Sequence, residues 1–203
     1  LKIDNLSNSD DTVVLYKYVK TLENYIDIHH AGTAMRFLTA LLSIQNNKEF
    51  VVTGSKRMKQ RPIEILVDAL NNLGADISYK DKTGFPPLLI KGKEIVGGEI
   101  SLSSDTSSQY ISALMLIAPI LKNGLLINLQ GQITSKPYID MTLAILKKIG
   151  IKGGKILGAG QSGYFLVYVE PKYQIKITEF LRKKNIIEIK FNFTQKGMQI
   201  WEG

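Results

Sequence analysis

Hydrophobic residues at helical spacing alternate along this chain with short runs of strand-forming residues. Residues 49–53 (EFVVT) predict a strand, after which a polar link leads to Arg61-Pro62 and to a helix. The helix is indicated by apolar side chains every three to four residues, at Ile63, Leu66, Val67, Leu70 and Leu73. Proline suits the first turn of a helix, and Gly74 suits the position just after the last turn.

The same plan returns further along the chain. Residues 124–129 (GLLINL) predict a strand, Lys136-Pro137 opens a helix, and Gly150 closes it. The offset is 75 residues at the basic-Pro pair and 76 at the closing glycine. A near-constant offset of this kind is the signature of an internally repeated fold.

Each predicted strand is preceded by a further helix. Residues 34–44 are predicted to form the first of these helices, and residues 108–120 its counterpart. The second is apolar nearly all round, which predicts a buried helix. A shorter version opens the chain, with a strand at residues 1–6 followed by a helix that carries Leu15, Tyr18, Val19 and Leu22 on one face. Short strands are expected between the copies, at residues 76–80, 88–91 and 99–103.

We therefore expect an α/β (α+β) fold built from pseudo-symmetric repeats of βαβαββ type, with the helices inside and the sheets outward. No Gly/Ser-rich linker divides the chain, so residues 1–203 are expected to form a single lobe. The tail, residues 152–203, departs from the repeat. It begins with a glycine-rich region and is expected to complete the lobe with strands at 165–169 and 186–193 and a helix at 178–184.

Composition and charge narrow the function classes. The chain has no cysteine, which excludes disulfides and thiolate metal sites, and its two histidines, His29 and His30, are adjacent. Neighbouring residues rarely point at one metal ion, so no metal site is expected. The longest apolar run, residues 111–121, is too short to span a bilayer, and a cytoplasmic location is expected. A net charge of +8 favours anionic ligands.

Three predicted helix starts carry small or polar residues that suit anion binding. Free backbone N–H groups and the helix dipole attract anions there, and Ser or Thr hydroxyls add donors. The alternative is that these residues are simple N-caps, for which Ser and Thr are preferred. The three segments are Ala31-Gly32-Thr33, Ser107-Ser108-Gln109 and Ser135-Lys136-Pro137-Tyr138.

Arginine side chains lie near these helix starts. Arg36 follows Thr33 by one helical turn and could face the same ligand, or it could extend along the surface. Arg57, Lys59 and Arg61 cluster in the link between strand and helix. They could clamp a carboxylate or phosphate, or they could form a solvated basic loop.

Other reactive groups receive no catalytic role. Asp10, Asp11 and Asp140 lie at helix starts, where a carboxylate interacts favourably with the helix dipole, and His30 has no partner carboxylate in the sequence. The chain contains no P-loop, GxSxG or HExxH motif. The basic run at 56–61 leaves a nucleic-acid-binding domain as an alternative, although no aromatic stacking platform accompanies it.

Four segments together resemble the EPSP synthase (3-phosphoshikimate 1-carboxyvinyltransferase) family, in the family's order and at matching spacing. They are AGTAMRFLTA (31–40), TGSKRMKQRPI (53–63), TSSQYISALM (106–115) and SKPYIDMTL (135–143). The resemblance covers residues 1–151 and implies one lobe of an enolpyruvyl transferase-like fold. It also implies two substrates, phosphoenolpyruvate and shikimate 3-phosphate, and no cofactor or metal. In the family's reaction the 5-hydroxyl of shikimate 3-phosphate adds to C2 of phosphoenolpyruvate, and the adduct then loses phosphate.

The resemblance also assigns roles. It places Gly32 and Arg61 on phosphoenolpyruvate with Thr33 beside it, and glyphosate would bind near Gly32. Arg36 and Lys136 receive secondary roles. The residues expected to contact shikimate 3-phosphate are Ser107, Ser108, Gln109, Ser135 and Tyr138.

Some positions depart from the family pattern. His30 stands where the family usually has asparagine or aspartate, and Phe37 replaces a proline common in some members. The family's early Lys-Ser…Arg segment would precede Leu1, and the acid–base groups of the second lobe lie outside this chain. We therefore expect no catalytic residue here, a missing second lobe as partner, and no activity from this chain alone.

Two alternatives accompany the resemblance. The sister enzyme that acts on UDP-N-acetylglucosamine shares the fold and the phosphoenolpyruvate chemistry, but the SSQ and SKPY segments favour shikimate 3-phosphate. The other alternative is a structural lobe whose only role is to associate with a missing half. Neither a nucleic acid nor a membrane is expected as partner.

Overall fold

The computed structural model describes residues 5–103, 106–130 and 135–149, together with four short strands of the tail. The chain divides into two compact units, residues 1–166 and 167–203. No division falls near Lys80, between the two predicted repeats. The expectation that all 203 residues form one lobe stays a prediction.

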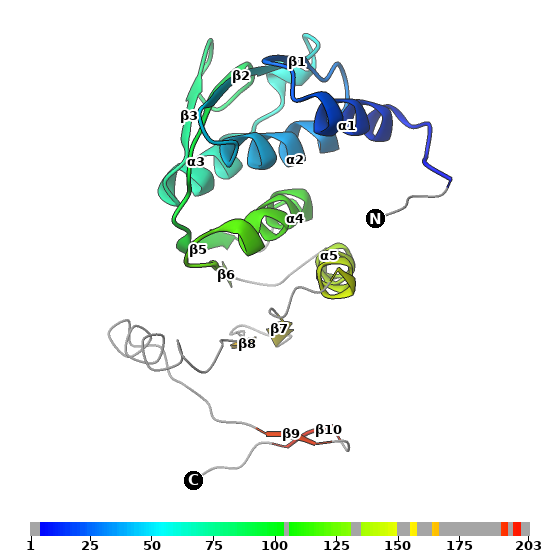
Figure 1. Ribbon diagram of the computed structural model, residues 1–203, viewed down its shortest axis with the longest axis vertical. Coiled ribbons are helices and arrows are strands. Elements are labelled where there is room, and N and C mark those ends of the chain that lie inside the picture. The colour runs from blue at the N-terminus through cyan, green and yellow to red at the C-terminus, as the bar shows by residue number, and fades with distance from the viewer. Residues whose placement is uncertain are drawn as a thin grey trace. The chain divides into compact units, whose positions relative to one another are not determined.

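A four-stranded sheet with the order β1-β2-β4-β3 covers one side of the first unit (Figure 1). Its strands are β1 (Tyr25–Asp27), β2 (Lys48–Thr53), β3 (Asp76–Tyr79) and β4 (Leu88–Gly92). β1 and β2 are parallel, whereas β4 is antiparallel to both β2 and β3. The last three strands match the predicted ones closely. β1 was not predicted, because three residues are too few to show a pattern.

Helix α2 (Gly32–Ser43) lies under this sheet and is the centre of the core. Its flanking helices are α1 (Asp10–Thr21) and α3 (Glu64–Asn72). Phe50, Leu88 and Ile90 of the sheet are fully buried, as are Leu38 and Leu42 of α2. The helix predicted at residues 34–44 is thus confirmed, and it begins two residues earlier than expected.

Helix α4 (Ser108–Ile117) packs against the other side of α2. Eight of its ten residues are buried, as the all-round apolar sequence predicts. Pro119 lies in a short 3₁₀ turn, η2 (Ala118–Ile120), that follows the α-helix. A proline cannot supply the N–H that a continued helix needs, so the α-helix ends where the expected one continued to Ile120.

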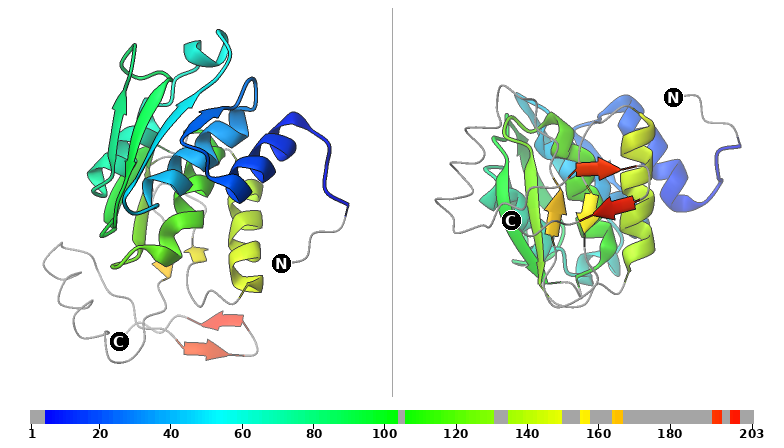
Figure 2. Two further views of the ribbon diagram at one scale, coloured as in Figure 1. Left: turned by 45° about the horizontal axis from the view of Figure 1, so that its top comes forward. Right: turned by 90° about the horizontal axis from the view of Figure 1, so that it is seen from below.

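The second parallel strand pair is formed by β5 (Gly98–Ser103) and β6 (Leu125–Gln130), with α4 between them in sequence. The pair β1–β2 likewise has α2 between its strands. Helix α5 (Lys136–Lys148) stands beside α4 (Figure 2). The mixed α/β class is confirmed, and a symmetry that relates the two halves stays a prediction.

The α3 segment differs from its prediction at the start. A 3₁₀ turn, η1 (Met58–Gln60), precedes Arg61 and Pro62, and the α-helix begins only at Glu64. Pro62 therefore lies just before the helix and not in its first turn. At the other end Leu73 is the C-cap and Gly74 follows it with φ +105°, as predicted.

In the tail the structure describes the antiparallel pairs β7 (Lys155–Leu157) with β8 (Tyr164–Leu166), and β9 (Asn192–Thr194) with β10 (Gly197–Gln199). The helix expected at 178–184 lies outside the described residues, as do Gly150 and most of the strands expected at 165–169, 186–193 and 1–6.

Candidate functional site

Two loops meet where the parallel strands β1 and β2 end. Asp27 and Thr53 are register partners at the ends of their strands, so the loops that follow leave the same edge of the sheet. The Ile28 N–H donates to the Thr53 carbonyl and the Ser55 N–H donates to the His29 carbonyl, both at 3.0 Å. The first loop leads into α2, and the second leads through η1 to Arg61.

Side chains also join these loops. Nδ1 of His30 lies 2.9 Å from Oγ of Ser55, which accepts the Met58 N–H at 3.2 Å. A methyl group at Gly54 would lie 2.9 Å from the His29 carbonyl oxygen, so a larger residue there would push the loops apart. His30 is thus a structural, exposed histidine, which agrees with the interpretation from the sequence.

Gly32 is buried at the first turn of α2, and two guanidinium groups lie against it. A methyl group at Gly32 would lie 2.5 Å from Nη1 of Arg61 and 2.8 Å from Nη1 of Arg36. Only glycine lets these cations approach the backbone this closely. The structure therefore brings together three residues that the sequence singled out, at the N-terminus of a helix.

Arg36 is a buried cation, with 7% of its surface exposed, and does not extend along the surface. Its Nη1 donates to the Gly32 carbonyl at 2.6 Å, and its guanidinium lies 5.4 Å from the centre of the Tyr110 ring. Nε is buried without a partner among the described residues. Burial of a charge is costly unless an opposite charge accompanies it. None of the ion pairs found in the described ranges includes Arg36 or Arg61.

The start of α4 contacts this site through two side-chain hydrogen bonds. Nε2 of Gln109 donates to Oγ1 of Thr33 at 3.2 Å, and the Tyr110 hydroxyl donates to the Pro62 carbonyl at 2.8 Å. These two contacts join residues that are 76 and 48 positions apart in the sequence. Thr33 and Gln109 are thus direct neighbours, and the residue after Arg61 is held by α4.

Ser107 and Ser108 lie at the same end of α4. Ser107 is the N-cap, and its Oγ accepts the Gln109 N–H at 3.4 Å. This is the capping role that the sequence left open as the alternative. Ser107 is exposed and Ser108 is buried, so only the first presents its side chain freely to solvent.

The start of α5 is tied to α4 and not directly to Gly32. Oγ of Ser112 is 2.9 Å from Oγ1 of Thr142, which donates to the Tyr138 carbonyl. Nζ of Lys136 contacts Asp140 at 2.7 Å, and the Tyr138 side chain is 63% exposed. Within the described part of the chain, no hydrogen bond joins Ser135 or Tyr138 to α2. Their place in the site stays a prediction.

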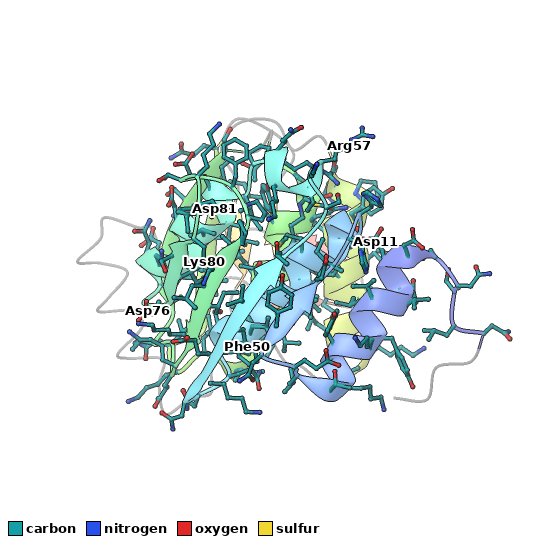
Figure 3. All side chains as sticks on the ribbon, turned by 90° about the horizontal axis from the view of Figure 1, so that it is seen from above. Asp11, Phe50, Arg57, Asp76, Lys80 and Asp81 are labelled. Carbon is teal, nitrogen blue, oxygen red and sulfur yellow. The ribbon has the colours of Figure 1, made fainter. Side chains whose placement is uncertain are left out.

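Asp11 contacts the site from α1, and nothing in the sequence pattern indicated this. Its Oδ1 accepts the N–H groups of Thr33 at 2.7 Å and Ala34 at 3.2 Å. Figure 3 shows Asp11 at the start of α1, beside α2. The sequence placed this carboxylate on the dipole of its own helix, and the structure shows that it also caps another.

Tyr110 and Ser55 were also missed. Both act through contacts that cross the chain, so no local spacing could have revealed them. The one general signal that could have indicated Tyr110 is that the hydroxyl of a buried tyrosine usually has a hydrogen-bond partner.

Some further classes of site are absent from the described ranges. No group of three or more His, Cys, Asp or Glu side chains there is placed to hold a metal ion. The helices described are all too short or too polar to cross a membrane.

Comparison with known proteins relates this arrangement to one family. The model of the family EPSP synthase (3-phosphoshikimate 1-carboxyvinyltransferase) matches residues 1–180. A 3-phosphoshikimate 1-carboxyvinyltransferase from Bacteroides fragilis strain YCH46 is 53% identical over 148 residues, which is 73% of this chain and 36% of the relative. One from Shewanella piezotolerans is 47% identical over 122 residues, covering 60% of this chain and 28% of the relative.

A solved structure supports the fold. An EPSP synthase from Acinetobacter baumannii superimposes with a TM-score of 0.53 and 24% identity, over 72% of this chain and 31% of that one. The chain thus spans about a third of the length of the proteins it matches. The extent of the family match, together with the identity to the curated relatives, shows that this chain belongs to the EPSP synthase family.

Proposed function

We propose that this chain is the part of a 3-phosphoshikimate 1-carboxyvinyltransferase that binds phosphoenolpyruvate at the N-terminus of α2. The observation that carries the proposal is the pair of guanidinium groups, from Arg36 and Arg61, against Gly32. No ion pair in the described ranges neutralises either of them, so an anionic ligand would supply the missing countercharge.

Each residue has a distinct part in this binding. The Gly32 N–H is the backbone donor, since it has no acceptor among the described residues. Arg61 is exposed and free to pair with a carboxylate or phosphate in the two-point geometry that arginine favours. Arg36 holds the Gly32 carbonyl and adds positive charge from within the core.

Shikimate 3-phosphate is the proposed second substrate, held beside the first by the starts of α4 and α5. Gln109 contacts Thr33 and so lies next to the phosphoenolpyruvate site. Ser107 and Ser108 add hydroxyls at the same helix start, and we expect Ser135 and Tyr138 to approach from α5. The activity named for the curated relatives supports shikimate 3-phosphate over UDP-N-acetylglucosamine.

In the proposed reaction the 5-hydroxyl of shikimate 3-phosphate adds to C2 of phosphoenolpyruvate while C3 takes a proton. The adduct then loses phosphate and leaves an enolpyruvyl ether. The residues gathered at Gly32 are suited to hold the carboxylate and phosphate charges in place during these steps. They are not suited to move protons, because guanidinium groups stay charged.

Calorimetric titration of the 203-residue chain tests the proposal. Phosphoenolpyruvate in the presence of shikimate 3-phosphate should bind, and Arg61→Ala should weaken it about tenfold or more, since a hydrogen bond to a charged group contributes about 1.5–3 kcal/mol. Arg57→Ala is the matched control. It removes the same charge from the same loop, at an exposed position.

The control should change the affinity by less than about twofold, the effect of a screened surface charge. Equal losses in both variants would show a diffuse attraction of anions and not a site at Gly32. Tight binding of duplex DNA, with no response to either substrate, would overturn the proposal in favour of a nucleic-acid-binding domain.

A further inference from the structure

Helix α2 begins without a capping side chain of its own. Its N-cap residue is Ala31, which carries no polar atom, and Gly32 follows it. The first turn of a helix has N–H groups that no carbonyl of the same helix can accept. In a protein that binds an anion at this terminus, those N–H groups would all be available to the ligand.

Asp11 takes two of them. Its Oδ1 accepts the Thr33 N–H and the Ala34 N–H from 22 and 23 residues earlier in the chain. The next N–H, of Met35, donates to the Ala31 carbonyl. The Gly32 N–H is therefore the single backbone donor of this turn that has no acceptor within the described residues.

This arrangement places a carboxylate at the helix terminus that we propose as the anion-binding site. The carboxylate and the ligand compete for the same helix terminus and repel each other there. Arg61 and Arg36 lie on the Gly32 side of the turn, while Asp11 occupies the Thr33 and Ala34 side. A ligand can satisfy Gly32 and the arginines at once only if it stays clear of Asp11.

We propose that Asp11 is a specificity-determining positioning residue, which confines the anionic substrate to the Gly32 N–H and the two arginines. The proposal deepens the function proposed above and rests on it for the identity of the substrate, phosphoenolpyruvate. Inorganic phosphate is a product of that reaction and would otherwise fit the helix terminus well. By filling this terminus, Asp11 limits competition from the product.

The experiment uses the 203-residue chain labelled with ¹⁵N, and inorganic phosphate and phosphoenolpyruvate as separate probes. Amide chemical shifts of Gly32, Thr33 and Ala34 report which N–H groups meet the anion. The variants are Asp11→Asn, whose amide oxygen can still accept both N–H bonds, and Asp11→Ala, which frees them. Asp10→Asn is the matched control, because it removes the same charge from the neighbouring exposed residue of α1.

In the unaltered chain, either anion should shift the Gly32 amide and leave Thr33 and Ala34 nearly unchanged. Affinity for inorganic phosphate should rise about threefold to tenfold in Asp11→Asn, the range expected for one charge at a helix terminus. It should rise further in Asp11→Ala, where all three amides then respond, and stay unchanged in Asp10→Asn. If Asp11 were only a structural cap, the order of phosphate affinities would be reversed, and Asp11→Ala would bind phosphate most weakly.

The outcomes separate this inference from the proposed function. If phosphoenolpyruvate binds the unaltered chain and shifts Thr33 and Ala34 as far as Gly32, the function stands and the role of Asp11 is refuted. If phosphoenolpyruvate does not bind but the Asp11 variants gain phosphate binding in the stated order, Asp11 retains its role and the proposed function fails. If no variant gains phosphate binding, the inference is wrong.

Discussion

At the scale of single residues, two side-chain polar atoms within the described part of the chain are buried without a hydrogen-bond partner. Nε of Arg36 belongs to the site, where an anion would compensate its charge. The other atom is the Tyr79 hydroxyl, on β3, which has no role in the proposed site and no hydrogen-bond partner among the described residues. Burial raises the pKa of Tyr79 to about 12, with smaller contributions from Asp68 and Glu64.

Replacement of Tyr79 by phenylalanine should stabilise the protein. At pH 7 the free energy of unfolding should rise by about 1 kcal/mol, because the change removes a buried hydroxyl that makes no hydrogen bond. Urea denaturation followed by circular dichroism would measure it. Tyr25→Phe, at a residue that is 63% exposed, is the control and should leave stability unchanged.

The same variant should differ from the parent protein in its response to alkaline pH. The pKa of the Tyr79 phenol is near its ordinary value of 10.0 in the unfolded chain, and burial raises it to about 12 in the folded one. Between these values the unfolded state binds fewer protons, so the free energy of unfolding falls as pH rises. Tyr79→Phe should lack this fall. If the free energy of unfolding falls equally with pH in both proteins from pH 10 to 12, the raised pKa of Tyr79 is contradicted.

At the scale of helices, a polar contact sits within the apolar interface of α4 and α5. Ser112 and Thr142 are both buried, with 5% and 6% of their surfaces exposed. The Thr142 hydroxyl donates to the Tyr138 carbonyl, so Ser112 is the donor in the bond between the two side chains. This bond fixes how α5 lies on α4, and with it the start of α5 that carries Ser135 and Tyr138.

We expect the two side chains to be energetically coupled. Ser112→Ala and Thr142→Val should each lower the free energy of unfolding by about 1–2 kcal/mol, and the double variant should lose less than their sum. Thr39→Val is the control, since Thr39 is also buried but donates to the Met35 carbonyl within its own helix. Its effect should add to that of Ser112→Ala. Additive effects in the first pair as well would show that no bond links the helices.

Helices and strands were predicted well where their patterns are long. The periodic apolar residues of α2, α4 and α5 gave their positions within a few residues, because a helix that packs on a core must repeat its apolar face every turn. The prediction was wrong in detail where three-dimensional contacts intervene. Val19 was placed on the face of α1 shared with Tyr18, yet it is 48% exposed while Tyr18 is buried.

At the scale of the whole molecule, the net charge and the kinds of side chain present at the candidate site bear on binding and on catalysis. There are 26 Lys and Arg residues against 18 Asp and Glu, and this excess of positive charge favours anionic ligands such as the two substrates proposed above. The side chains gathered at Gly32 are guanidinium groups, a hydroxyl and an amide, and Asp11 is engaged in capping. None of these is a free acid or base positioned for proton transfer.

We therefore expect binding without turnover from the 203-residue chain. Phosphate release from phosphoenolpyruvate and shikimate 3-phosphate should not exceed the background, because general acid–base catalysis contributes about 100-fold to 10,000-fold and its groups are expected elsewhere in the enzyme. The assay should be repeated with Arg61→Ala. Turnover that this variant abolishes would show that the catalytic groups do lie within the chain.

The sequence by itself determined the mixed α/β class, most of the helices and strands, and the candidates Gly32, Thr33, Arg36, Arg61 and Gln109. These follow from local periodicity and from residue chemistry, both of which can be read from short stretches of the sequence. Only the tertiary structure decided that Arg36 is buried, that Asp11 caps α2, and that Tyr110 ties α4 to Pro62. Such contacts join segments tens of residues apart, and one carboxylate or hydroxyl gives no local sign of which distant N–H or carbonyl it will meet.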